Sequence, residues 1–139
     1  MQSNRRFCVS AQEKDRPYHV LIVDDEEDID ILTKQRFRKE IQAGLFAFYF
    51  ARNGQDALDE IARRGVIDVI MTDVNMPQMD GFELLAKVRT RYPNIKTVMI
   101  SAYSDQQSMQ AALNGGACAF ISKPLDFGVL QQTLRDLCP

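Results

Sequence analysis

Short apolar runs alternate with amphipathic patterns along the chain from about residue 18 onward. The apolar runs are continuous and β-type, as expected of strands that are buried on both faces of a parallel sheet. Between them, apolar residues recur at intervals of three and four, which indicates helices with one buried side. Strands are expected at 19–23, 46–51, 66–73, 95–101 and 117–122, and helices at 27–42, 54–65, 81–92, 104–116 and 124–137.

Strands that alternate with helices in this way restrict the fold class. The alternation is typical of βαβ units, which give a parallel sheet with right-handed crossovers. A chain of 139 residues is too short for a barrel of eight such units. We therefore predict an α/β fold: a doubly wound five-stranded parallel sheet of the flavodoxin-like (βα)5 type, with strand order 2-1-3-4-5.

The expected helices also indicate which of their residues face the core. In the second helix these are Ala57, Leu58 and Ile61. Ser104 is a candidate N-cap for the fourth helix. In the first helix the residues expected on the inner side are Ile29, Leu32, Phe37 and Ile41.

The strand at 46–51, FAFYFA, is unusually aromatic for a strand that the predicted order places at the edge of the sheet. We interpret its rings as part of the core. The alternative is that some of them are exposed, or that the polar segment 1–17 covers them. We interpret that segment as a flexible N-terminal arm and residues 18–139 as the globular domain.

Composition and charge narrow the class of protein further. The chain is 45% hydrophobic and 26% charged with a net charge of −2, so it has no broad basic field for nucleic acid. No apolar run approaches the ~20 residues that span a membrane, and the N-terminus lacks the apolar stretch of a secretory signal. We therefore predict a cytoplasmic protein that binds neither nucleic acid nor membrane directly.

The cysteines and the lone histidine exclude several kinds of site. Cys8, Cys118 and Cys138 are far apart and lack metal-ligand spacing, so free thiols in a reducing compartment are expected. His19 lies at the start of an apolar run, where a structural or solvent-facing role is expected. The pattern excludes both a multi-histidine metal site and a histidine-based triad.

Polar side chains stand at the carboxyl ends of four predicted strands. In open α/β sheets, ligands bind outside these strand ends. In the order 2-1-3-4-5 the four strands are consecutive neighbours about 4.8 Å apart, so their terminal side chains can converge on one site. The strand-end residues, in chain order, are Asp24, Asp25, Asp73, Ser101 and Lys123.

This set of side chains favours one reaction. Carboxylates held close together repel one another, and a hard divalent cation such as Mg²⁺ offsets that repulsion. A metal, the Lys123 ammonium and the Ser101 hydroxyl around a carboxylate form a receptor for a phosphoryl group. We therefore predict that Asp73 is a nucleophile that becomes phosphorylated, with Mg²⁺ as cofactor.

Each of these residues has a plainer interpretation on its own. An aspartate at a strand end is usually a turn or N-cap residue, and the acidic run 24–27 could be the first turn of a helix. Lys123 followed by Pro124 carries little information alone. The coincidence of four polar strand ends suited to one reaction favours the functional interpretation.

Four motifs together are highly specific for one family. The chain from about His19 to Leu137 resembles the receiver domain of bacterial two-component response regulators. The resemblance implies a signalling domain rather than an enzyme, since such domains catalyse only their own phosphorylation and dephosphorylation. The stretches that carry the resemblance are VLIVDDE (20–26), DVIMTDVNMPQMDGFELL (68–85), MISAYS (99–104) and GACAFISKPL (116–125).

The resemblance implies roles for the residues at the strand ends. Asp73 would accept a phosphoryl group from a phosphohistidine on a sensor histidine kinase or a phosphotransfer protein. Asp25 and Asp73 would ligate Mg²⁺ together with the backbone carbonyl of Asn75. Asp24 would act directly or through water.

The resemblance also implies a switch. Lys123 would pair with the phosphate, Ser101 would move in to bond it, and Phe120 would occupy the aromatic switch position. Ser101 stands where threonine is commoner, and Phe120 lacks the hydroxyl of the tyrosine often found there. The Lys123-Pro124 bond would be cis. The segment 104–137 would present the surface that controls an output domain or partner protein, or that pairs two copies of the chain.

Two other functions are compatible with part of this pattern. One is a Mg²⁺-dependent aspartyl-phosphate hydrolase of the haloacid dehalogenase type, whose nucleophile belongs in a D-x-D pattern that the run 24–27 does not supply. The other is a phosphorylation-independent scaffold of the same fold, against which the intact Asp73, Ser101 and Lys123 set argues. Because the chain ends in RDLCP just past the last helix, we expect the receiver piece of a longer protein, with a single-domain regulator as the alternative.

Overall fold

The expected strands form a parallel sheet in the computed structural model, which describes residues 16–76, 78–102 and 106–138. Within these residues the sheet has five strands in the order β2-β1-β3-β4-β5, so the predicted fold class and strand order are confirmed. The strands are β1 (Tyr18–Val23), β2 (Phe46–Ala51), β3 (Val69–Asp73), β4 (Lys96–Ser101) and β5 (Ala119–Ser122).

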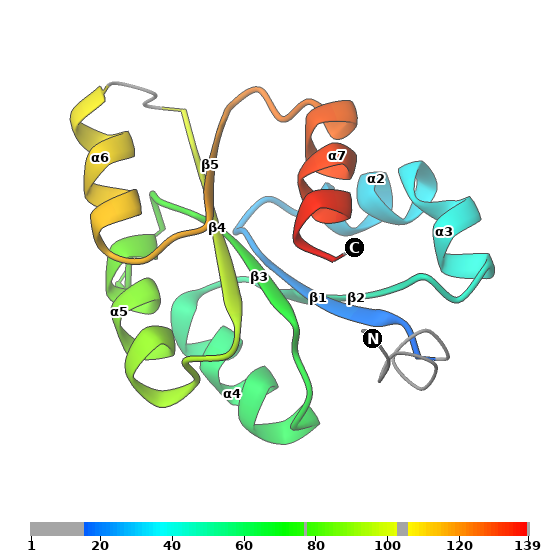
Figure 1. The fold of residues 1–139 in the computed structure, drawn as a ribbon, viewed down its shortest axis with the longest axis horizontal. Helices are drawn as coiled ribbons and strands as arrows, with labels where there is room; N and C mark the ends of the chain where they lie inside the picture. The colour runs from blue at the N-terminus through cyan, green and yellow to red at the C-terminus, as the bar shows by residue number, and fades with distance from the viewer. Residues whose placement is uncertain (1–15, 77, 103–105, 139) are drawn as a thin grey trace, which may run out of the picture.

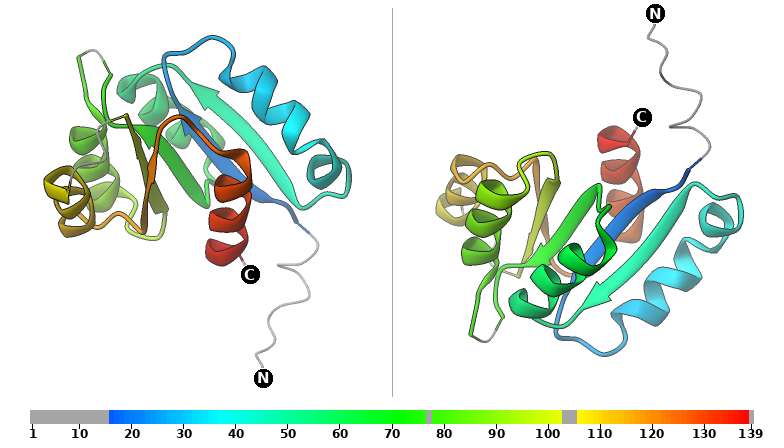
Figure 2. Two further views of the ribbon diagram at one scale, coloured as in Figure 1. Left: turned by 90° about the horizontal axis from the view of Figure 1, so that it is seen from above. Right: turned by 90° about the horizontal axis from the view of Figure 1, so that it is seen from below.

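Helices cover both faces of the sheet (Figure 1). One layer holds α2, α3 and α7, and the other holds α4, α5 and α6, as the views from above and below also show (Figure 2). This is the doubly wound arrangement. The helices are α2 (Ile29–Arg36), α3 (Arg38–Gln42), α4 (Gly54–Arg64), α5 (Gly81–Arg91), α6 (Gln106–Asn114) and α7 (Phe127–Leu137).

The core has two sides because successive residues of a strand point to opposite faces of the sheet. On β1, Val20 and Ile22 pack toward the layer of α2, α3 and α7, where Leu130 and Leu134 are fully buried. Leu21 and Val23 pack toward α4 and α5. The predicted inner face of the second helix is confirmed: its buried apolar residues are Ala57, Leu58 and Ile61.

Helix ends follow the capping chemistry of the sequence. The side chains of Asn53 and Asp80 each accept a hydrogen bond from the first turn of the helix that follows. Gly65 ends α4 in the left-handed conformation, with φ of 77°. Asp126 caps α7, so the helix expected at 124–137 begins only at Phe127. The candidate N-cap Ser104 lies outside the described residues.

The first helix differs from the prediction. The expected helix at 27–42 is divided into α2 and α3 at Phe37, whose backbone leaves helical values (φ −101°, ψ 19°). The ring of Phe37 is fully buried beside Phe46 and Phe48, so packing against β2 fixes this position. Leu32 was expected to face the core but is 47% exposed, and the next residue, Thr33, is buried in its place.

The third strand also begins later than expected, at Val69 rather than at residue 66. The cause is Asp68, whose carboxylate accepts a hydrogen bond from the backbone N–H of His19 at 2.8 Å. The same carboxylate is paired with Arg16 at 3.0 Å. Asp68 therefore ties the start of β1 to the loop before β3 and precedes the strand instead of joining it.

Most rings of the edge strand β2 are only partly buried. Phe46 is buried, whereas Phe48, Tyr49 and Phe50 are of intermediate burial. The interpretation of these rings as core is thus correct for Phe46 and only partly correct for the others. Residues 1–15, which hold most of the expected N-terminal arm, lie outside the described residues.

The remaining sequence expectations concern His19 and the cysteines. The ring of His19 stacks on that of Tyr49 and shares a 2.8 Å hydrogen bond with its hydroxyl, which is the expected structural role. Cys118 and Cys138 are free thiols, as expected, and Cys8 lies outside the described residues. Among the helices of the described chain, none is long and apolar enough to cross a bilayer.

Candidate functional site

The sheet register lines up the strand ends that carry polar side chains. Thr72 of β3 pairs with Val23 of β1, so Asp73 and Asp24 each lie one residue further along adjacent strands. Asp73 pairs with Ile100 of β4, one residue before Ser101. Because parallel strands end at the same edge of a sheet, these side chains meet at its carboxyl edge.

Three carboxylates form the acidic part of this edge. One oxygen from each of Asp24, Asp25 and Asp73 lies within 4.8 Å of the others. Asp24 is 6% exposed and Asp73 is 5% exposed, whereas Asp25 is exposed. Carboxylate oxygens are the ligands that Mg²⁺ prefers, so this donor set fits a divalent cation.

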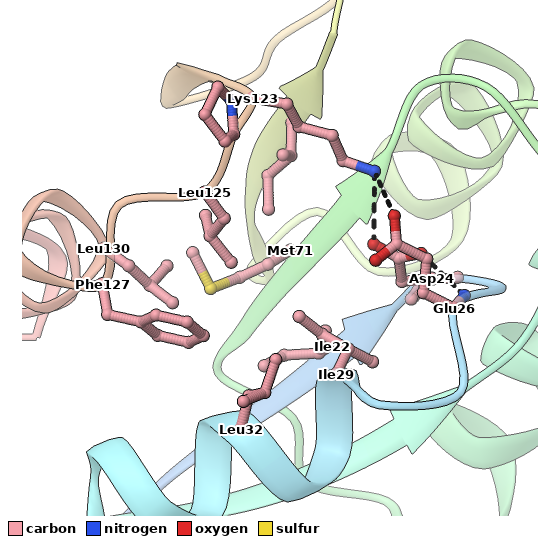
Figure 3. Close-up of a pocket in the computed structure, with 13 residues that line it drawn as sticks. Ile22, Asp24, Glu26, Ile29, Leu32, Met71, Lys123, Leu125, Phe127 and Leu130 are labelled. Carbon is pink, nitrogen blue, oxygen red and sulfur yellow. Dashed lines mark hydrogen bonds and ion pairs between the residues drawn. The ribbon is translucent and has the colours of Figure 1, made fainter.

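Lys123 supplies the positive charge of the site. Its Nζ lies 2.8 Å from Oδ2 of Asp73, 3.6 Å from Oδ2 of Asp24 and 3.3 Å from Oε1 of Glu26. Figure 3 shows the Lys123 side chain extending from the loop after β5 toward Asp24 and Glu26. The peptide bond from Lys123 to Pro124 is cis, as the resemblance implied.

Glu26 was not among the predicted site residues. It is an exposed side chain, and the acidic run after the first strand was the only signal that could have indicated it. Its backbone N–H also donates a 2.9 Å hydrogen bond to Oδ1 of Asp24. Glu26 therefore helps to hold Asp24 and shares the Lys123 ammonium with it.

The pKa values of the Asp24 carboxyl and the Lys123 ammonium are both raised, for different reasons. Burial raises the pKa of the Asp24 carboxyl, a change that Asp73 reinforces and that the Glu26 N–H and Lys123 oppose. Burial alone would lower the pKa of the Lys123 ammonium. Its hydrogen bond to Asp73, with the charges of Asp24 and Glu26, outweighs burial and raises that pKa above its ordinary range. Lys123 therefore stays charged at neutral pH.

Backbone groups of the loop after β3 fix the position of Asp73. Oδ1 of Asp73 accepts a hydrogen bond from the backbone N–H of Asn75 at 3.1 Å. The N–H of Gly81, the first residue of α5, donates to the carbonyl of Val74 at 2.9 Å. A Cβ atom at Gly81 would lie 2.6 Å from the Asp73 carbonyl oxygen and 2.9 Å from Cα of Val74. Only glycine allows this close approach of two backbone segments.

Gly81→Ala should therefore destabilise the protein by about 2–3 kcal/mol, because both contacted atoms are backbone and cannot yield without strain. Urea denaturation, followed by far-UV circular dichroism, measures the change. Gly128→Ala is the matched control near the start of α7, where an added Cβ would meet only the Asp126 side chain at 3.1 Å. The control should change stability by less than about 1 kcal/mol. Equal effects of the two substitutions would contradict the backbone clash.

Ser101 and Phe120 lie on the side of the site toward β5. Ser101 is the last residue of β4 and is 1% exposed, and its backbone carbonyl accepts the N–H of Lys123 at 2.8 Å. Phe120 pairs with Met99 of β4 and is partly buried against a cluster that includes Met99 and Ala112. The structure thus places the two residues on neighbouring strands, with the ring facing α6.

A cavity of about 270 Å³ lies beside the charged groups, between α2 and α7. Its walls are mainly apolar, and the charged groups of Asp24, Glu26 and Lys123 lie to one side of the apolar residues, as Figure 3 shows. Leu32, which is exposed and lies outside the core, lines this cavity together with other apolar residues. The other labelled wall residues are Ile22, Ile29, Met71, Leu125, Phe127 and Leu130.

Comparison with known proteins identifies the family of this chain. A model of the response regulator receiver domain matches residues 20–135. The chain belongs to the response regulator receiver domain family. A receiver domain is a phospho-accepting signalling domain and not an enzyme in the usual sense. This membership argues against the hydrolase alternative.

Relatives of this receiver domain include regulators of very different length. It is 34% identical over 117 residues to the transcriptional regulatory protein ZraR of Klebsiella oxytoca, which is 84% of this chain and 25% of that protein. It is 32% identical over 120 residues to the sporulation initiation phosphotransferase F of Bacillus subtilis, which is 86% of this chain and 93% of that protein. The chain thus spans about a quarter of the first relative and nearly all of the second.

Solved structures resemble this receiver domain along almost their whole length. The chemotaxis protein CheY4 of Vibrio cholerae is 29% identical with a TM-score of 0.75, covering 87% of this chain and 98% of that one. A chain of the CheX-CheY-BeF3-Mg²⁺ complex from Borrelia burgdorferi is 30% identical with a TM-score of 0.73, covering 90% of this chain and 92% of that one.

Proposed function

We propose that this receiver domain, residues 18–139, takes a phosphoryl group onto Asp73 from a phosphohistidine of a sensor histidine kinase or phosphotransfer protein in the cytoplasm. The observation that carries the proposal is a nearly buried Asp73 carboxylate 2.8 Å from the Lys123 ammonium, at the strand edge where three carboxylates gather. One of its relatives is named a phosphotransferase, and another was solved with BeF3 and Mg²⁺, which supports the assignment.

In the proposed reaction an oxygen of Asp73 attacks the phosphorus atom, forming an O–P bond while the N–P bond to the donor histidine breaks. The electron pair of the broken bond stays on the imidazole nitrogen, which leaves with the donor. Lys123 then faces the phosphoryl oxygens as a fixed positive charge, because its pKa is raised and it remains protonated. The Lys123 ammonium would exchange the Asp73 carboxylate for a phosphoryl oxygen as its partner, and no further side chain is needed for this exchange.

Asp24, Asp25 and Asp73, with the backbone carbonyl of Asn75, are the residues we propose to hold Mg²⁺. The cation supplies charge neutralisation for the incoming phosphoryl group when it is bound. The carboxylates alone concentrate negative charge that would repel a phosphate, so the ammonium of Lys123 cannot balance the site unaided. Phosphorylation is therefore expected to depend on a divalent cation.

Incubation with Mg²⁺ and a small acyl phosphate such as acetyl phosphate tests this function. Intact-mass spectrometry should show the gain of one phosphoryl group, and peptide mapping should place it within residues 68–85. Chelation of the cation with EDTA should remove the gain, because the carboxylate repulsion is then uncompensated. A gain that persists in EDTA, or that maps elsewhere, would contradict the proposed site.

We further propose that phosphorylation moves Ser101 and Phe120. A phosphoryl group on Asp73 offers the Ser101 hydroxyl a charge-assisted hydrogen bond, which would draw the end of β4 inward. Phe120, partly buried on the adjacent strand, would turn into the space left behind. The surface of α6, β5 and α7 would change with it and would bind an output domain, a partner protein or a second copy. Exposed apolar residues on this surface are Met109, Leu113 and Val129.

Amide hydrogen exchange with and without the phosphate mimic beryllofluoride measures this switch. Protection should change within residues 101–123, whereas the protection of β1 and β3 should stay constant, because only the end of β4, β5 and α6 rearrange. The two states are expected to differ by only a few kcal/mol, so the free protein should already sample the active form. No change in this range with the mimic demonstrably bound would leave Phe120 as a fixed core residue.

A further inference from the structure

The outer edge of β2 lies at the margin of the sheet, two strands away from β3, which ends in Asp73. β2 pairs with β1 along all six residues, and no other strand in the described part of the chain pairs with it. Figure 2 shows β2 at this margin with α2 and α3 running alongside. Its sequence, FAFYFA, contains no charged residue and no proline, which are the usual means of blocking an edge. Its outward N–H and C=O groups are thus suited to a further strand.

A groove of about 430 Å³ adjoins this edge. Its apolar part comprises Ile41, Ala47 and Phe48, and its cations are Lys34 and Arg38. Lys34 lies on α2 and Arg38 is the first residue of α3, and both line this groove. A strand added to β2 would therefore lay its side chains on an apolar floor with positive charge along one wall.

The positive charge is concentrated although the whole chain has a net charge of −2. The run 34–39, KQRFRK, contains four cations and no acidic residue. All four cations are exposed, while Phe37 between them is buried. Lys34 Nζ also lies 5.6 Å from the centre of the Phe50 ring, so the wall stands directly over the aromatic strand.

We propose that the β2 edge and this groove bind an extended acidic segment of another protein, which adds to the sheet as a sixth strand. Main-chain hydrogen bonds to β2 would supply affinity, and the cations would select acidic side chains at alternate positions. A second copy of the chain fits less well, because it would bring the same basic run against this one. Nucleic acid also fits less well, because Phe48 and Phe50 are half-buried against the core and offer no open stacking platform.

A capped peptide of alternating glutamate and valine tests the proposal with the full chain. Fluorescence anisotropy of the labelled peptide should show at least about tenfold tighter binding than the matched lysine–valine peptide. The variant Lys34→Glu/Arg38→Glu should bind the acidic peptide at least about tenfold more weakly, because two attractions become repulsions. Lys87→Glu/Arg91→Glu reverses the same residue types at the same spacing on α5 and should bind as the wild type does.

Amide hydrogen exchange distinguishes strand addition from simple charge attraction. The acidic peptide should slow exchange of the outward-facing N–H groups of β2, residues 46–51. Binding without this protection would overturn the proposal, as would equal loss of binding in both double variants. Protection of β2 in the free monomer would show that the chain covers its own edge, and protection with concentration-dependent dimerisation would assign the edge to a second copy. Tighter binding of a single-stranded oligonucleotide than of the acidic peptide would assign the cations to nucleic acid. Protection in the free monomer, dimerisation through β2 and tighter oligonucleotide binding would each overturn the proposal.

Discussion

Asp73→Asn should leave the protein without a phosphoryl group under conditions in which the wild type is fully modified by acetyl phosphate and Mg²⁺. The asparagine amide has nearly the same shape but is a poor nucleophile, so the loss should be complete rather than partial. Intact-mass spectrometry over a time course measures it. The matched control is Asp80→Asn on the same loop, because asparagine also serves as an N-cap and should preserve α5. The control should be modified at the wild-type rate.

The same variant has a second consequence, which concerns the pKa of the neighbouring Asp24 carboxyl. Because the charge of Asp73 contributes to the raised pKa of Asp24, its removal should bring the pKa of Asp24 closer to the ordinary value of 3.8. The sign follows from the loss of a neighbouring negative charge, which makes ionisation easier. Titration of the carboxyl carbon by NMR measures the shift. Full phosphorylation of Asp73→Asn would refute the acceptor assignment, whatever the titration shows.

Lys123→Ala should slow phosphorylation by small donors by about 10²–10³-fold, the usual effect of removing one preorganised charge from a transition state. The residue is the only cation placed within 4 Å of Asp73 among the described residues, so no other side chain replaces it. Single-turnover kinetics by mass spectrometry measure the rate. Lys87→Ala on α5 is the control and should retain the wild-type rate. A Lys123→Ala rate within about threefold of the wild type would show that the ammonium has no role in the transfer.

The sequence was most informative at the strand ends. Asp24, Asp73 and Lys123 could be placed together because strand order and the carboxyl-edge rule bring consecutive strand ends to one edge. The cis bond before Pro124 followed from the family resemblance and could not be read from spacing. The first inference rests on sheet topology and the second on a local motif, and neither needs knowledge of side-chain packing.

Features that depend on tertiary contacts were harder to predict. The division of the first helix at Phe37 and the late start of β3 after Asp68 result from a buried ring and a hydrogen-bonded carboxylate. The spacing of apolar residues along the sequence gives no information about either interaction. The apolar cavity beside Lys123 combines residues as distant in sequence as Leu32 and Leu130, so no single segment could indicate it.

The strand order has a consequence for the number of proteins that can be bound at once. β2 and β5 are the two margins of the sheet, separated by four strand spacings or about 19 Å. β3, which ends in Asp73, lies midway between them. A strand added at the β2 margin does not occupy the β5 margin, so the two margins are separate surfaces. A partner tethered at β2 would then raise the local concentration of whatever it carries near the acceptor, and the gain in rate would come from tethering alone.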